Sequence, residues 1–112
     1  MILINLNNQD MELKFTINSI CFLEEKSGKG IIQLVDTSNF GFNTIRLLIW
    51  AGLLHKIPNL TPEIAGIWLD AEIKKDFNNF EKLSEKAMNA LTESGLLGKN
   101  TKEEEKKIIP HL

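Results

Sequence analysis

Cysteine and histidine are scarce in this chain of 112 residues, and their scarcity excludes several kinds of chemistry. Cys21 is the only cysteine, so no disulfide can form within the chain, and a reducing compartment suits it. His55 and His111 are the only histidines, which leaves a histidine acid/base pair or a metal site short of partners. Cys21 lies among apolar residues, where an inert buried thiol is expected. We therefore expect a non-enzyme with no metal and no cofactor.

The chain also lacks a net positive charge and a long apolar run. Thirteen basic residues face 15 acidic ones, for a formal net charge of -2, so no basic field attracts nucleic acid. The longest apolar run spans residues 47–54, whereas a membrane-spanning helix needs about 20 residues. The first ten residues lack the basic start of a signal peptide. We expect neither nucleic acid nor a membrane as a partner, and a cytoplasmic location.

The stretch 43–70 holds both tryptophans and organises the rest of the chain. It predicts a central helix from Thr44 to His55, apolar on nearly every side: Ile45, Leu48, Ile49 and Leu53 share one face, and Leu47, Trp50 and Leu54 cover most of the other. The second face offers two interpretations. It can present surplus apolar area to another chain, with Arg46, Leu47, Trp50 and Leu54 as partner-binding residues, or the rest of the fold can cover it.

The first 15 residues have the pattern of a β-hairpin. Apolar residues alternate on both sides of a turn expected at residues 7–10, first Ile2, Ile4 and Leu6, then Met11, Leu13 and Phe15. Two strands alone are marginal in water, so their apolar face must lie on helices. The open edge could also pair with another copy, with Ile2 and Leu3 as the self-association edge, because no lysine guards it in the sequence.

Capping and breaking residues place the remaining helices. Asn18 is expected to cap a helix that runs to about Lys26, with Ile20, Phe22 and Leu23 inward and Gly28 as its stop. A short helix is expected around residues 31–35. Asp76 is expected to cap a last helix, residues 77–94, which Gly95 ends.

The clearest boundary is Thr61-Pro62-Glu63, which combines a cap, a proline in the first turn and an acid near the amide end. It predicts a helix with Ile64, Ile67, Trp68 and Ala71 as its inner face. The fold expected is mainly α (α+β), with an N-terminal two-stranded antiparallel hairpin packed on a bundle of four to five helices. Residues 1–97 form a single domain in this interpretation, and residues 98–112 form a mobile charged tail.

Two segments, Leu13–Leu34 and Ile45–Asp70, resemble the tail assembly chaperones of long-tailed bacteriophages and prophages, a group that extends to gene transfer agents. The most recognisable parts are Phe15 with Leu23-Glu24-Glu25 and Gly28, the segment Leu48-Ile49-Trp50-Ala51-Gly52-Leu53, and Pro58 with Leu60-Thr61-Pro62-Glu63. The chain departs from the usual pattern by its apolar first strand and its charged tail. Each match is a feature of fold rather than of chemistry.

The resemblance implies a late viral protein of the host bacterial cytoplasm that is not part of the mature virion. Such a protein binds the tape measure protein, keeps it soluble and assists the tail tube protein to polymerise around it, with no cofactor. The alternative is a structural tail component, such as a tube or tube-terminator subunit. The sequence favours the chaperone, since tube subunits are usually rich in strands and this chain predicts one hairpin.

Overall fold

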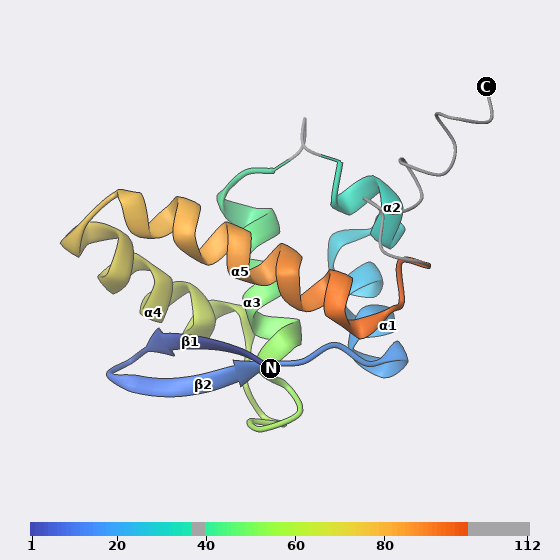
Figure 1. Ribbon diagram of the computed structural model, residues 1–112, viewed down its shortest axis with the longest axis horizontal. Helices are drawn as coiled ribbons and strands as arrows, with labels where there is room; N and C mark the ends of the chain where they lie inside the picture. The colour runs from blue at the N-terminus through green and yellow to red at the C-terminus, as the bar shows by residue number, and fades with distance from the viewer. Residues whose placement is uncertain (37–39, 99–112) are drawn as a thin grey trace.

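The computed structural model describes residues 1–36 and 40–98, which form two strands and five helices. The elements are β1 (Ile2–Leu6), β2 (Gln9–Leu13), α1 (Ile17–Ser27), α2 (Ile31–Leu34), α3 (Phe42–Leu53), α4 (Pro62–Lys75) and α5 (Asn78–Ser94). The strands form an antiparallel hairpin that packs on the helices, so the predicted α+β fold is confirmed (Figure 1). The predicted tail falls, apart from Gly98, outside the described residues.

The hairpin turns at Asn7 and Asn8, whose φ angles are 54° and 61°. Asparagine tolerates this left-handed backbone, and two such residues in succession make the turn that matches the natural twist of a hairpin. The turn is therefore shorter than the one expected over residues 7–10. The resulting register pairs Ile4 with Met11 and buries both side chains against the helices.

Helix α3 is the centre of the molecule, as predicted, and it packs against α1, α4, α5 and β2. Figure 1 shows α5 crossing in front of α3, with α4 and the hairpin beside them. The helix begins at Phe42 after Gly41, not at Thr44, and ends at Leu53, not at His55. At this end the Leu54 amide donates to the Ala51 carbonyl and the Lys56 amide to the Leu53 carbonyl, bonds of the 3₁₀ type that tighten the last residues into a turn. All of its residues from Thr44 to Leu53 except Arg46 are buried.

Helix α1 begins earlier than predicted because Thr16, not Asn18, is its cap. The Thr16 hydroxyl accepts from the Ser19 amide and the Ser19 hydroxyl accepts from the Thr16 amide, which satisfies two end groups at once. Gly28 ends the helix with a φ of 73°, as expected. The prediction that Phe22 points inward is wrong, and Cys21 is exposed rather than buried. Phe22 lies about 200° around the helix from buried Ile20, so it cannot share that face.

Helix α4 begins as predicted, with the Thr61 hydroxyl accepting from the Ile64 amide, but its predicted inner face is wrong. The buried residues are Pro62, Ala65 and Leu69. The predicted set behaves differently: Ile64, Ile67 and Ala71 are exposed and Trp68 is half-buried. The helix carries apolar residues on two faces, and the face with Pro62, Ala65 and Leu69 is the one that is buried as α4 packs against α3 and α5.

Helix α5 largely follows its prediction and closes the core with Leu83, Ala87, Ala90 and Leu91. It begins one residue later than expected, at Asn78, whose amide donates to the Asp76 carboxylate over 2.9 Å. Gly95 ends it with a φ of 76°. Phe80 and Met88 are half-buried, so this side of the helix reaches the surface.

Candidate protein-binding surface

Most of the apolar area predicted to bind a partner is covered by the chain itself. Leu47 is 3% exposed and Trp50 is 6% exposed, while Leu54 is half-buried. The Trp50 indole N–H donates to the Leu60 carbonyl over 2.7 Å, and Leu60 is itself buried. The expectation that Leu47 and Trp50 offer a free surface is therefore wrong, because the segment that follows α3 folds back over Trp50.

Arg46 lies in a different environment, on a hollow between α3 and α4 of about 350 Å³. Its guanidinium donates to the Asn43 side-chain oxygen over 2.9 Å, and its aliphatic stem lies beside Gly66, which has no side chain to displace it. Most of the other lining residues are apolar. The lining comprises Phe42, Ile45, Arg46, Gly66, Leu69, Asp70, Ile73, Lys74 and Phe80.

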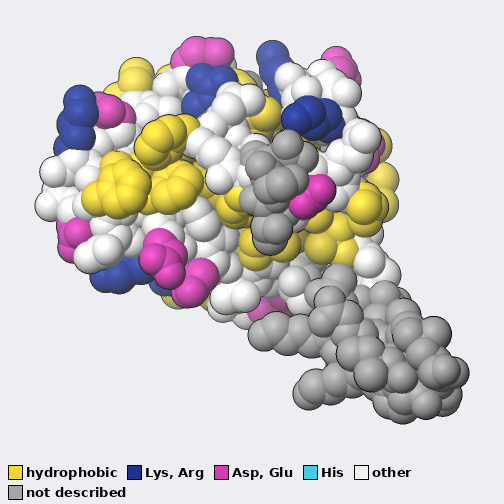
Figure 2. Space-filling model, turned by 90° about the horizontal axis from the view of Figure 1, so that it is seen from above, with side chains coloured by type: hydrophobic (Ala, Val, Ile, Leu, Met, Phe, Trp, Pro, Cys, Tyr) yellow, Lys and Arg dark blue, Asp and Glu magenta, His cyan; other side chains and the backbone are white. Residues whose placement is uncertain are grey.

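Three phenylalanines form a cluster at this hollow, and two of them, Phe42 and Phe80, line it. The ring centroids of Phe42 and Phe80 lie 4.9 Å apart in an edge-to-face contact, and those of Phe77 and Phe80 lie 6.0 Å apart. Phe42 is 62% exposed and Phe77 is 66% exposed, although both are large apolar side chains. We call the hollow and these three rings the aromatic groove. Figure 2 shows hydrophobic side chains gathered on this face, bordered by acidic and basic ones.

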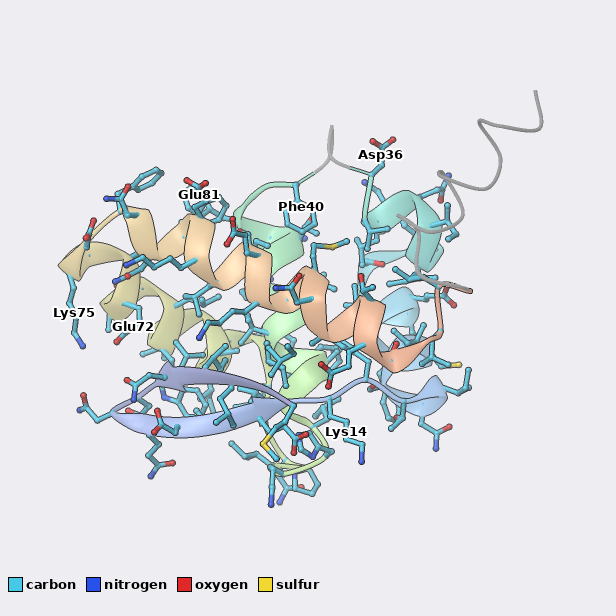
Figure 3. All side chains as sticks on the ribbon, viewed as in Figure 1. Lys14, Asp36, Phe40, Glu72, Lys75 and Glu81 are labelled. Carbon is cyan, nitrogen blue, oxygen red and sulfur yellow. The ribbon has the colours of Figure 1, made fainter. Side chains whose placement is uncertain are left out.

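A second hollow extends the aromatic groove past Phe80. Its lining includes Phe40, Phe77 and Glu81, and Phe80 belongs to both hollows. Figure 3 shows Phe40 from the segment before α3 and Glu81 from α5 on the same side of the molecule. The groove is therefore built where the starts of α3 and α5 meet the C-terminal half of α4.

Charges of both signs surround the apolar floor of the aromatic groove. Lys74 pairs with Asp70 over 2.9 Å on α4, and Glu81 and Arg46 lie on the two other helices. A surface with an aromatic centre and a charged border of mixed sign is typical of protein-binding sites. It suits a partner with an apolar stripe and polar flanks.

The edges of the hairpin are guarded, so the premise of the predicted self-association edge is wrong. Leu3 is exposed and Ile2 is half-buried, but the Leu3 carbonyl accepts from the Lys86 ammonium over 2.8 Å. On the other strand the Glu12 carbonyl lies 2.8 Å from the Nε2 atom of His55. A lysine distant in sequence thus occupies the edge that looked open.

Two further findings concern only residues 1–36 and 40–98. Within these ranges no three histidine, cysteine, aspartate or glutamate side chains lie close enough together to hold a metal ion. No helix in the same ranges is long and apolar enough to cross a membrane.

The residues that form the aromatic groove, other than Arg46, were not among those proposed from the sequence to bind a partner. Phe42 and Phe77 stand next to helix starts, where helical periodicity does not assign a side chain to a face. A signal was nevertheless present, since four of the six phenylalanines fall in the two short segments 40–42 and 77–80. Comparison with protein-family models, curated proteins and solved structures finds no match to this chain.

Proposed function

We propose that this protein is a tail assembly chaperone of the type found in long-tailed bacteriophages and prophages. It acts in the host bacterial cytoplasm, where it binds apolar helical segments of the tape measure protein in the aromatic groove. The observation that carries the proposal is the cluster of Phe42, Phe77 and Phe80, two of them mostly exposed, over an apolar hollow.

The energetics of the aromatic groove suit a temporary partner. Burying a phenylalanine side chain that was exposed contributes about 1.5 to 3 kcal/mol, so Phe42 and Phe77 give a partner a substantial gain. The hollow itself, about 350 Å³, has room for only a few large apolar side chains. Affinity is then moderate, which allows the chaperone to release the tape measure when tube subunits enclose it.

The resemblance to tail assembly chaperones supports the scaffold of this site rather than the rings themselves. Leu48–Leu53 lies in α3 and Thr61–Glu63 begins α4, and these two helices form the floor and one wall of the aromatic groove. Phe15 follows the hairpin, Leu23 lies in α1 and Gly28 ends α1, and both the hairpin and α1 pack against α3. The binding residues of the groove are thus proposed from geometry and exposure.

The test is co-expression with the tape measure protein encoded nearby, followed by capture of this protein from the soluble fraction. We expect soluble tape measure with the wild type and at least about tenfold less with Phe42→Ser/Phe77→Ser, since exposed aromatic anchors dominate such interfaces. Phe22→Ser is the matched control, because Phe22 is 52% exposed on α1, away from the groove. Circular dichroism establishes that each variant folds.

A tape measure protein that stays equally insoluble with and without this protein would overturn the proposed function. If the wild type and the double variant captured equal amounts of tape measure protein, the aromatic groove would not be the binding site. Mass spectrometry of purified virions distinguishes the alternative, a tube or tube-terminator subunit. A chaperone is absent from virions, whereas a structural subunit is present in stoichiometric amounts.

A further inference from the structure

Helix α4 carries a second apolar stripe that the monomer leaves open. Ile64, Ile67 and Ala71 are exposed along one side of the helix, and half-buried Trp68 lies at the edge of the stripe. The positions follow the i, i+3, i+4, i+7 spacing with which one helix packs against another. Ile67 is 66% exposed in the middle of the helix. Isoleucine is not among the best helix formers, so at an exposed position it does not stabilise the helix of the monomer.

The stripe is separate from the face that holds α4 in the core. That inner face uses Pro62, Ala65 and Leu69, which lie about 160° to 220° around the helix from Ile67. Gly66 and Ile73, which line the aromatic groove, lie about 100° to 120° away. Asp70 and Lys74 also line the groove and lie only about 60° and 20° from Ile67, so the stripe borders the groove on one side. The inference about the stripe does not rest on the proposed function.

The charges beside the stripe select a direction for the partner helix. Glu63 stands at the N-terminal end of α4, and Lys74 and Lys75 stand at its C-terminal end. Two copies of α4 side by side in parallel would place Glu63 against Glu63 and Lys74 against Lys74. In antiparallel order Glu63 of one copy comes near Lys74 of the other, and the helix dipoles oppose one another. Lys74 and Lys75 each also pair with an acid of their own helix, Asp70 and Glu72.

Side-chain sizes fit the same arrangement. In an antiparallel pair centred between Ile67 and Trp68, Ile64 of one copy lies opposite Ala71 of the other, and Ile67 lies opposite Trp68. Glu63 and Lys74 of the other copy are then about 3 Å apart along the helix axis. The contact of Ile64 with Ala71, a large side chain over a small one, occurs twice by symmetry and allows the helices to approach at both ends of the stripe.

We propose that α4 is the interface of a symmetric dimer in which a second copy of this chain packs antiparallel on the stripe formed by Ile64, Ile67, Trp68 and Ala71. The two-fold axis passes between Ile67 and Trp68, so each copy covers the stripe of the other. One helix face provides less than the roughly 800 Å² per partner of a standard interface, and the dimer is therefore concentration-dependent. Each dimer presents two aromatic grooves.

Sedimentation velocity over a wide concentration range tests the dimer. We expect a monomer–dimer equilibrium for the full chain and a midpoint concentration at least about tenfold higher for Ile67→Asp, which buries a charge at the axis. Ile32→Asp is the matched control, because Ile32 is 68% exposed on α2 and lies outside the stripe. A wild type that is monomeric at every concentration, or an equal loss of dimer in both variants, would overturn the proposal.

Cross-linking tests the direction of the pair in the Cys21→Ser background, which removes the native thiol. Ile67→Cys places two thiols close to the two-fold axis and should give a covalent dimer on mild oxidation. Lys75→Cys places them about 22 Å apart along the axis in the antiparallel pair and next to each other in a parallel pair. Efficient cross-linking at position 75, or none at position 67, contradicts the antiparallel dimer.

Discussion

At the scale of single residues, Trp50 holds the segment that follows α3 against the core. Its indole lies in the core, and the only polar atom of its side chain donates to the Leu60 carbonyl over 2.7 Å. This bond satisfies a buried carbonyl in a segment without regular structure, where no neighbouring strand or helix supplies a donor. Trp50 therefore positions the residues that precede Thr61, the cap of α4.

We expect Trp50→Phe to lower the free energy of unfolding by about 2 to 3 kcal/mol, because it leaves the Leu60 carbonyl buried without its donor and reduces packing volume. Trp68→Phe is the control and should cost less than about 1 kcal/mol, since Trp68 is half-buried. Urea unfolding of both variants measures the difference. Equal losses would show that volume, rather than the hydrogen bond, accounts for the effect at position 50.

At the scale of elements, the hairpin can dock on α3 only because α3 has a glycine at the crossing point. A Cβ atom on Gly52 would lie 2.8 Å from the Leu13 Cδ2 atom and 3.2 Å from the Phe15 ring. The same glycine accepts the Lys14 amide with its carbonyl over 2.9 Å, which joins the end of the hairpin to the helix backbone. Leu13 and Phe15 are both buried, so neither side chain can move away freely.

Gly52→Ala and Gly66→Ala should therefore change stability in opposite directions. Alanine in a helix gains about 1 kcal/mol over glycine, but at position 52 overpacking against Leu13 costs about 1 to 3 kcal/mol, for a net loss. At position 66 the nearest atom is Cδ of the flexible Arg46 side chain, at 3.1 Å, and the helix gain remains. Thermal unfolding of both variants checks the two signs, and a stabilised Gly52→Ala would refute the close contact.

At the scale of the whole molecule, the start of the hairpin is held to the far end of the described chain. The Met1 ammonium pairs with the Glu93 carboxylate on α5 over 2.9 Å, and the Lys86 ammonium donates to the Leu3 carbonyl. The hydrogen bond and charge of Glu93 raise the pKa of the Met1 ammonium above its ordinary value of 8.0. The two contacts join β1 to α5, which are separated by most of the sequence.

The raised pKa predicts how this contact depends on pH. A folded-state pKa above the unfolded value means that the contribution to stability is complete below about pH 8 and is lost as pH rises through the folded pKa. As pH rises above about 8, the wild type should lose more thermal stability than Glu93→Gln, with Glu85→Gln on the same helix as control. An NMR titration of Met1 measures the pKa directly, and an equal pKa in wild type and Glu93→Gln would contradict the pairing.

Local chemistry made much of the fold predictable. Thr61, Gly28 and Gly95 act through their own backbone and nearest neighbours, so the ends that they mark could be identified from the sequence. The alternation of the first 15 residues likewise predicted the hairpin. The candidate site was harder to predict, because exposure of Phe42 and Phe77 depends on which helices meet beside them.

The sequence by itself determined which segments become strands and helices, since capping, turn chemistry and apolar periodicity act within a few residues. The tertiary structure decided which apolar face is inside. It covered Trp50 and Leu47, turned Ile64 and Ile67 outward, and brought Lys86 to the edge of β1. These outcomes depend on how closely helices with two apolar faces can approach, and small residues such as Ala65 and Gly52 set that distance only once their partners across the core are present.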